Sequence, residues 1–154
     1  MDLILWRHAE AEDGADDLAR RLTRKGQQQA HLMAAWLRVR LPREFTLLAS
    51  EARRSQQTAA FLMKSYEVVP EINPNAQPQD VLKAVGWPQS DKTVVLVGHQ
   101  PYLGQLAAQL MSGQPDPWSV KKGAIWWLNH RGRGHIESVR LKVMMTPGML
   151  TSSE

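Results

Sequence analysis

Two histidines of this sequence follow apolar runs at positions where an imidazole can do chemistry. His8 comes two residues after the run 3–6, and His99 comes two residues after the run 93–97. An imidazole with one unprotonated nitrogen is a nucleophile, and a protonated one donates hydrogen bonds to oxyanions. One histidine after a strand is more often structural, so it is the repeated position that favours a shared site.

Arginines accompany the histidines. Arg7 precedes His8, and the pair Arg53 and Arg54 follows the apolar run 45–49. A guanidinium stays charged and donates a planar fork of N–H groups to phosphate oxygens. Transfer of a phosphoryl group depends mainly on positioning and electrostatics. The combination therefore indicates phosphoryl chemistry, and the helix N-termini predicted near Ser50 and Pro101 would add partial positive charge.

Hydrophobic spacing predicts the elements that position these residues. Apolar and β-branched runs predict strands within 3–6, 45–49, 68–69, 93–97, 124–128 and 136–143. Helical spacing predicts helices within 24–41, 51–63, 80–85 and 102–112. We expect Thr23 and Ser50 to cap the first two helices, Pro42 to end the first, and residues 131–134 to form a turn between the last strands.

Strands that alternate with helices predict an α/β fold. We expect a three-layer sandwich with a mostly parallel central sheet flanked by helices. Ligands of such sheets bind beyond the carboxyl ends of the strands. The two imidazoles and the arginines should therefore meet at one edge of the sheet, and the catalytic hypothesis fails if the two rings lie on opposite sides of the molecule.

Composition limits the class of protein. The 154 residues suit one domain, residues 1–154, and the 43% hydrophobic and 22% charged content is ordinary for a globular chain. There is no cysteine, no long apolar stretch and no basic segment before an apolar start, so we expect a cytoplasmic protein without a membrane span. The net charge of +4 comes from scattered Lys and Arg residues, which argues against a nucleic-acid-binding tail.

Five segments resemble, in order, motifs of the histidine phosphatase (phosphoglycerate mutase-like) superfamily. These are LWRHAE at 5–10, RRLTRKG at 20–26, SEARRSQQTA at 50–59, VGHQP at 97–101 and KKGAI at 121–125. The order of the matches makes them specific together, whereas each alone is weak. The short chain, without an inserted lid, most resembles the small SixA-type phosphohistidine phosphatases.

The resemblance implies a phosphoglycerate mutase-like fold and a role for each matching residue. His8 would be the nucleophile that becomes phosphorylated, and Arg7, Arg54 and His99 would hold the phosphoryl oxygens. Arg20 would assist at the edge of the pocket, or else form an ion pair within its loop. Arg54 is preferred to Arg53 because its spacing to the Gln-Thr-Ala segment at 57–59 fits the motif.

The sequence departs from the family pattern at two positions. Ala9 replaces a glycine, which matters only where the backbone needs a positive φ or a close approach. Glu51 replaces a proline and brings a carboxylate near the predicted anion site. Glu51 would either face solvent or serve as a proton donor.

The resemblance implies a phosphohistidine-containing protein as substrate, such as a phosphotransfer domain or a phosphocarrier. Loss of imidazole from a P–N bond needs less help from an acid than loss of an alkoxide, and an acidic loop offers carboxylates for that task, namely Glu10, Glu12, Asp13, Asp16 and Asp17. Two alternatives stay open, a phosphatase of small phosphate esters and a non-catalytic module that binds phosphate or nucleic acid. We expect no metal and no cofactor, since His8 lacks a helical histidine partner, and we expect a monomer.

The remaining histidines and the C-terminal tryptophans carry no motif. We interpret His31, His130 and His135 as surface residues. We interpret Trp118, Trp126 and Trp127 as core or sheet-face aromatics, with Trp118 as a candidate for lining a substrate groove.

Overall fold

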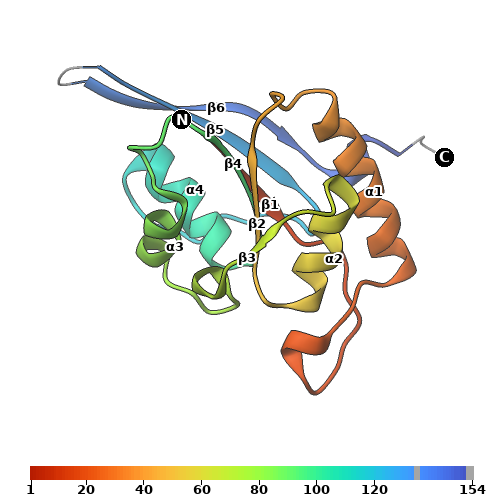
Figure 1. Ribbon diagram of the computed structural model, residues 1–154. Helices are drawn as coiled ribbons and strands as arrows, with labels where there is room; N and C mark the ends of the chain where they lie inside the picture. The colour runs from red at the N-terminus through yellow and green to blue at the C-terminus, as the bar shows by residue number, and fades with distance from the viewer. Residues whose placement is uncertain (134–135, 152–154) are drawn as a thin grey trace.

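The computed structural model describes residues 1–133 and 136–151. Strands and helices alternate as expected over the first two thirds of the chain (Figure 1). The strands are β1 (Asp2–Arg7), β2 (Thr46–Ala49), β3 (Glu67–Val68), β4 (Thr93–Gly98), β5 (Ile125–Arg133) and β6 (Ile136–Met145). The helices are α1 (Arg24–Arg38), α2 (Arg53–Leu62), α3 (Pro78–Val85) and α4 (Tyr102–Ser112), with short 3₁₀ turns η1 (Asp17–Ala19), η2 (Pro70–Ile72) and η3 (Pro147–Met149).

The six strands form one sheet in the order β3-β2-β4-β1-β5-β6. Strands β3, β2, β4 and β1 run parallel, whereas β5 and β6 pair antiparallel at the other side. The sheet is therefore mixed with a parallel majority, which confirms the predicted α/β class. Among the described residues, no helix combines the length and the apolar character that a bilayer span requires.

Helices cover both faces of the sheet, so the fold has three layers (Figure 1). Successive side chains of a strand point to opposite faces, and Leu3 and Leu5 of β1 pack in the core that includes residues of α3 and α4. Ile4 and Trp6 pack in the second core, with residues of α1 and α2. This double burial explains why β1 is apolar without alternation.

Three expected helix boundaries are wrong. Helix α3 begins at Pro78, two residues before its expected start at residue 80. Helix α1 ends at Arg38, before Pro42, although the amide of Leu41 still donates to the carbonyl of Leu37 and so extends the helical spacing. Helix α2 begins at Arg53 with Ala52 at its N-cap, whereas the hydroxyl of Ser50 contacts the amide of Ala52 and the ring of His99.

The other boundary signals hold in part. Thr23 caps α1 by accepting a hydrogen bond from the amide of Gly26, as expected. Residues 131–133 belong to β5 and not to a turn. Gly134, which completes the predicted turn, and His135 lie outside the described residues.

The parallel strands end at one edge, and this edge carries the predicted site. Strands β1 and β4 pair in register, so that Arg7 lies opposite Gly98. Strand β2 ends beside them at Ala49, since this residue pairs with Val97. The residues that follow these three strand ends are therefore neighbours in space, although they are far apart in the sequence.

Candidate active site

The backbone on either side of His8 is fixed from several elements. The amide of His8 donates to the carbonyl of Gly98 at 3.1 Å, and its carbonyl accepts from the amide of Gly123 at 3.0 Å. The next amide, that of Ala9, donates to the hydroxyl of Thr58 at 3.1 Å. Ala9 is fully buried and its φ is not positive, so alanine replaces the family's glycine here without backbone strain.

These constraints bring the two predicted histidines together. The ring centroids of His8 and His99 lie 5.1 Å apart, with the rings tilted by 52°. Both side chains are buried, with 7% and 2% of their surface exposed. The two imidazoles therefore lie side by side, as the sequence predicts.

The hydrogen bonds of His8 define its neutral tautomer. Its Nδ1 atom lies 2.7 Å from the carbonyl oxygen of Ala9, which can only accept, so Nδ1 carries the proton. The Nε2 atom then holds a free electron pair. Arg54 donates its Nε–H to this atom at 3.3 Å.

Arg54 lies between the histidines with only 4% of its surface exposed. Besides His8, its guanidinium approaches the Nδ1 atom of His99 at 3.5 Å through NH2. On the outer side, NH1 donates to the carbonyl of Asp17 at 2.6 Å and NH2 donates to the carboxylate of Asp17 at 3.1 Å. Arg53, by contrast, is exposed.

His99 is held from its other nitrogen. Its Nε2 atom lies 2.7 Å from the hydroxyl of Ser50 and 3.2 Å from the hydroxyl of Ser55. Both serines are fully buried, and the Ser50 hydroxyl also accepts from the amide of Ala52 at 3.2 Å. The ring therefore directs Nδ1 towards Arg54 and Nε2 towards the start of α2.

Arg7 supplies the second cation of the site. Its NH1 donates to the carbonyl of Val120 at 2.8 Å. Its buried Nε atom has no hydrogen-bond partner among the described residues. Burial and the nearby charge of Arg54 lower the pKa of Arg7, although the guanidinium stays charged at neutral pH. A buried donor without a partner is costly, and an anion would satisfy it.

Burial and nearby positive charges keep both histidines uncharged. Burial, followed by the positive charges of Arg54, Arg7 and Arg20, lowers the pKa of His8 to about 3 despite the opposing hydrogen bond to Ala9. Burial and the neighbouring His8 and Arg54 lower the pKa of His99 to about 2. A dianion between the rings would oppose these effects and raise both pKa values.

Arg20 reaches the site only through another residue. Its Nε donates to the carbonyl of Glu12 at 2.7 Å, and its NH1 forms an ion pair with the Asp17 carboxylate at 3.0 Å. Burial tends to raise the pKa of Asp17, but hydrogen bonds from Arg20 and Arg54 lower it below its ordinary value. Asp17 is thus an ionised carboxylate next to the site.

Glu51 is exposed and is bonded away from the imidazoles. Its carboxylate accepts from the amide group of Asn73 at 2.8 Å, and its backbone N–H donates to the Asn73 side chain at 2.8 Å. A proline at position 51 has no such N–H to donate. The replacement therefore ties the segment after β2 to the segment after η2, and this geometry favours the solvent-facing interpretation over a proton donor.

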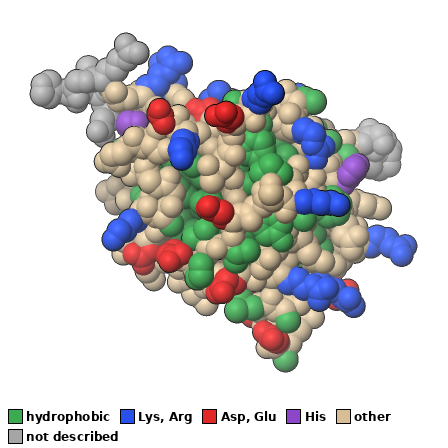
Figure 2. Space-filling view, in the orientation of Figure 1, with side chains coloured by type: hydrophobic (Ala, Val, Ile, Leu, Met, Phe, Trp, Pro, Cys, Tyr) green, Lys and Arg blue, Asp and Glu red, His purple; other side chains and the backbone are tan. Residues whose placement is uncertain are grey.

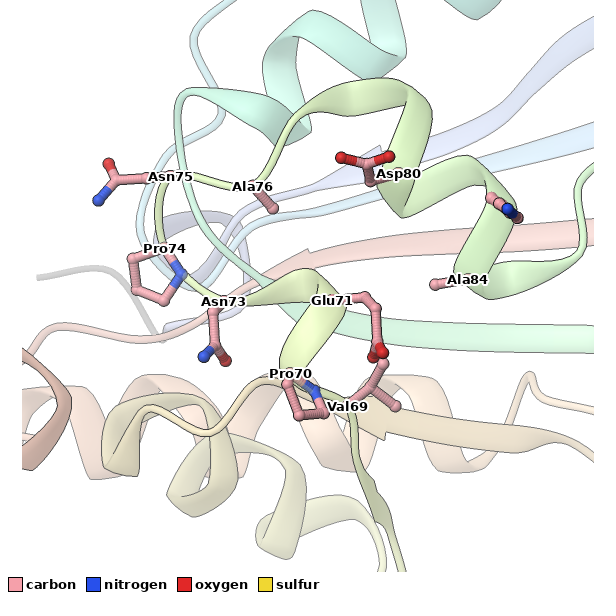
Figure 3. Close-up of a pocket in the computed structure, with 10 residues that line it drawn as sticks. Val69, Pro70, Glu71, Asn73, Pro74, Asn75, Ala76, Asp80 and Ala84 are labelled. Atoms are coloured by element: carbon pink, nitrogen blue, oxygen red, sulfur yellow. The ribbon is translucent and has the colours of Figure 1, made fainter.

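A hollow of about 730 Å³ has Asn73 among its lining residues (Figure 3). It is lined by residues of η2, the following loop and α3, and Asn73 is the lining residue that contacts Glu51. None of the predicted site residues lines it. The hollow is therefore distinct from the histidine pair.

Two contacts of the site were missed by sequence reasoning. The sequence groups Asp17 with four other carboxylates of its loop, and no periodic signal singles it out. Ser55 lies one residue after Arg54, and its contact with His99 joins segments 44 residues apart, which no local pattern indicates.

The remaining predicted positions lie apart from the site. His31 is exposed, and the ring of His130 packs on Trp87 with centroids 5.3 Å apart. Trp127 is buried in the core, and Trp118 and Trp126 pack against each other half-buried. Within the described part of the chain, no group of three or more His, Asp or Glu side chains could hold a metal ion.

Comparison with known proteins places these features in a family. The model of the histidine phosphatase superfamily (branch 1) matches residues 3–77. Phosphohistidine phosphatase SixA of Escherichia coli is 32% identical over 129 residues, covering 76% of this chain and 78% of SixA. A SixA homolog of Haemophilus influenzae is 31% identical over 141 residues, covering 81% of this chain and 85% of its own.

A solved structure agrees with the sequence relatives. The protein histidine phosphatase SixA complexed with tungstate superposes with a TM-score of 0.83 at 27% identity, covering 98% of this chain and all of its own.

Proposed function

The chain belongs to the histidine phosphatase superfamily, and we propose that it hydrolyses phosphohistidine on a partner protein through a phosphoryl intermediate on His8. The observation that carries this proposal is the convergence of two buried, neutral imidazoles and a buried arginine on one point. The solved SixA structure is a complex with tungstate, an oxyanion, which supports the proposal that this fold binds a phosphoryl group.

In the first step, the Nε2 atom of His8 attacks phosphorus, opposite to the leaving imidazole of the substrate. The new P–Nε2 bond forms as the P–N bond to the substrate breaks, and the substrate ring takes the electron pair of that bond. If the second nitrogen of the substrate ring is protonated, the ring leaves as neutral imidazole. The charge then passes to His8, whose Nδ1–H is held by Ala9, so no proton moves.

In the second step, water attacks the phosphoryl group on His8. The P–Nε2 bond breaks, its electron pair returns to Nε2, and dihydrogen phosphate carries both protons of the water away. Arg7 and Arg54 hold the phosphoryl oxygens throughout, because charge spreads over those oxygens in the transition state. His99 becomes protonated in the presence of the anion and donates from Nδ1, while its Nε2–H donates to Ser50.

The carboxylates favour a phosphohistidine over a phosphate ester. An alkoxide leaving group needs a proton donor, whereas the imidazole described above does not. The carboxylate that contacts Arg54 belongs to Asp17, and its lowered pKa keeps it ionised at neutral pH. Glu51 is occupied by Asn73. Hydrolysis of small esters remains the alternative.

The surface argues for a protein partner over nucleic acid. On the face shown in Figure 2, Lys and Arg side chains lie interspersed with Asp and Glu side chains. Binding to a nucleic-acid backbone favours a continuous basic stripe. We expect the enzyme to act as a cytoplasmic monomer.

Two measurements test the proposal. We expect the wild type to form an acid-labile phosphoryl adduct with a phosphohistidine peptide, His8→Ala to form none, and the exposed control His31→Ala to form it normally. We also expect faster turnover of phosphohistidine than of p-nitrophenyl phosphate. An adduct that persists in His8→Ala, or a clear preference for the ester, contradicts the proposal.

A further inference from the structure

Arg54 is held at two edges by different partners. Its Nε and NH2 atoms approach His8 at 3.3 Å and His99 at 3.5 Å. Its NH1 and NH2 atoms donate to the carbonyl and the carboxylate of Asp17 at 2.6 Å and 3.1 Å. One edge, Nε and NH2, thus faces the two histidines, and the adjacent edge, NH1 and NH2, is held by Asp17 alone among these contacts.

Asp17 is itself anchored. Its second carboxylate oxygen pairs with Arg20 at 3.0 Å, and Arg20 is fixed by the carbonyl of Glu12 at 2.7 Å. Asp17 lies in η1, in a loop whose residues 12–19 are all exposed, whereas Arg54 is 4% exposed. The loop after β1 therefore contacts Arg54 through one residue, Asp17, by its carbonyl and its carboxylate.

We propose that Asp17 is a positioning residue, which holds the outer edge of Arg54 so that its inner N–H groups point at the phosphoryl group on His8. The inference rests on the proposed function, because it assumes that His8 receives the phosphoryl group. When His8 becomes phosphorylated, the Nε–H of Arg54 loses its acceptor on Nε2 and donates to a phosphoryl oxygen instead. A guanidinium held by Asp17 exchanges one acceptor for the other without a change in its own orientation.

The charge of Asp17 adds a second consequence. Three arginines opposed by one carboxylate leave the site with two net positive charges while the histidines are neutral, and a phosphoryl dianion balances them. Removing the carboxylate charge would not weaken anion binding. The variant should instead lose reaction rate, because the orientation of Arg54 matters most in the transition state.

The test compares Asp17→Asn with Asp16→Asn, an exposed carboxylate in the same loop. Formation of the phosphoryl adduct from phosphoramidate is followed in a single turnover, and phosphate binding and the melting temperature are measured on the same samples. We expect Asp17→Asn to slow adduct formation about 10- to 100-fold. Phosphate affinity should stay equal or increase, the melting temperature should stay near that of the wild type, and Asp17→Glu should restore part of the rate.

Two outcomes overturn the inference. Asp17→Asn that labels as fast as the wild type and Asp16→Asn shows that the Asp17 carboxylate is not needed to orient Arg54. A joint loss of phosphate affinity and melting temperature shows that Asp17 only supports the loop. A wild type that forms no adduct refutes the proposed function itself and this inference with it, whereas an active wild type with an equally active variant refutes the inference alone.

Discussion

The Nε atom of Arg54 lies 3.3 Å from the Nε2 atom of His8, so a buried cation covers the ring nitrogen that holds the free electron pair. This contact explains two properties at once. It opposes protonation of the nitrogen, and under the proposed mechanism it places an N–H donor where the phosphoryl oxygens would lie.

Arg54 should be irreplaceable, while its neighbour should be dispensable. Arg54→Lys keeps the charge but loses the planar fork that serves both histidines and Asp17, so we expect kcat/KM for phosphohistidine to fall about 100-fold or more. Arg53→Lys, on the exposed side of α2, should leave it within about twofold. Steady-state kinetics of the two variants measures kcat/KM, and an equal fall in both would refute the assignment of Arg54, and not Arg53, to the site.

The stability of the protein should depend on pH through its two buried histidines. The pKa values of His8 and His99 are about 3 and 2 in the folded protein, below the ordinary value near 6.5. The unfolded chain therefore binds more protons between those values, and the free energy of unfolding falls as the pH falls below about 6.5. Above that pH, the contribution of the two neutral histidines to the free energy of unfolding is fully present.

Calorimetry between pH 7.5 and 4.5 measures this loss. We expect the melting temperature to fall through this range, and less steeply in His99→Asn, which has one titrating ring fewer. Phosphate should protect at the lower pH values because an anion raises both pKa values. A melting temperature that is flat with pH, or an equally steep one in His99→Asn, would show that the rings are not buried in their neutral forms.

The two serines should contribute unequally to the orientation of His99. Ser50 makes the shorter contact, at 2.7 Å against 3.2 Å for Ser55, and it also satisfies the amide of Ala52. Loss of one buried hydrogen bond costs about 1 kcal/mol. We expect Ser50→Ala to lower kcat about 5- to 10-fold and Ser55→Ala to lower it by less than about threefold.

Kinetics at saturating phosphohistidine measures both variants. If Ser55→Ala lowers kcat more than Ser50→Ala, the order of importance inferred from the distances is wrong. Ser55→Thr keeps a hydroxyl at this position and serves as the control.

Thr58 should matter for stability more than its size suggests. Its hydroxyl accepts from the amide of Ala9 at 3.1 Å and donates to the carbonyl of Arg54 at 2.8 Å, so it links the backbone after His8 to the backbone of Arg54. Thr58→Val keeps the volume but leaves a buried amide without a partner, which costs about 1–3 kcal/mol. Urea unfolding measures the difference, and Thr58→Ser, which keeps the hydroxyl, should lose less. Equal stability of the wild type and Thr58→Val would contradict the role.

The sheet and the meeting of the histidines were predictable because both follow from the apolar runs that mark the strands. An apolar strand that ends just before His8 and a β-branched strand that ends just before His99 bring the two residues together when they are parallel neighbours in this register. The partners of those histidines were harder to predict. Asp17 reaches Arg54 along a loop without periodicity, and the hydroxyl of Ser50 serves His99 when the local sequence indicates a helix cap.

The bonds that fix the backbone from His8 to Ala9 come from three separate segments, whereas residues 12–19 are exposed throughout. Under the proposed function, the backbone that carries the reacting ring is thus fixed, and the exposed loop beside it is the part open to contact with a partner protein. Substitutions at the exposed residues 13–16 would then change contacts with that partner and leave the hydrogen bonds around His8 intact.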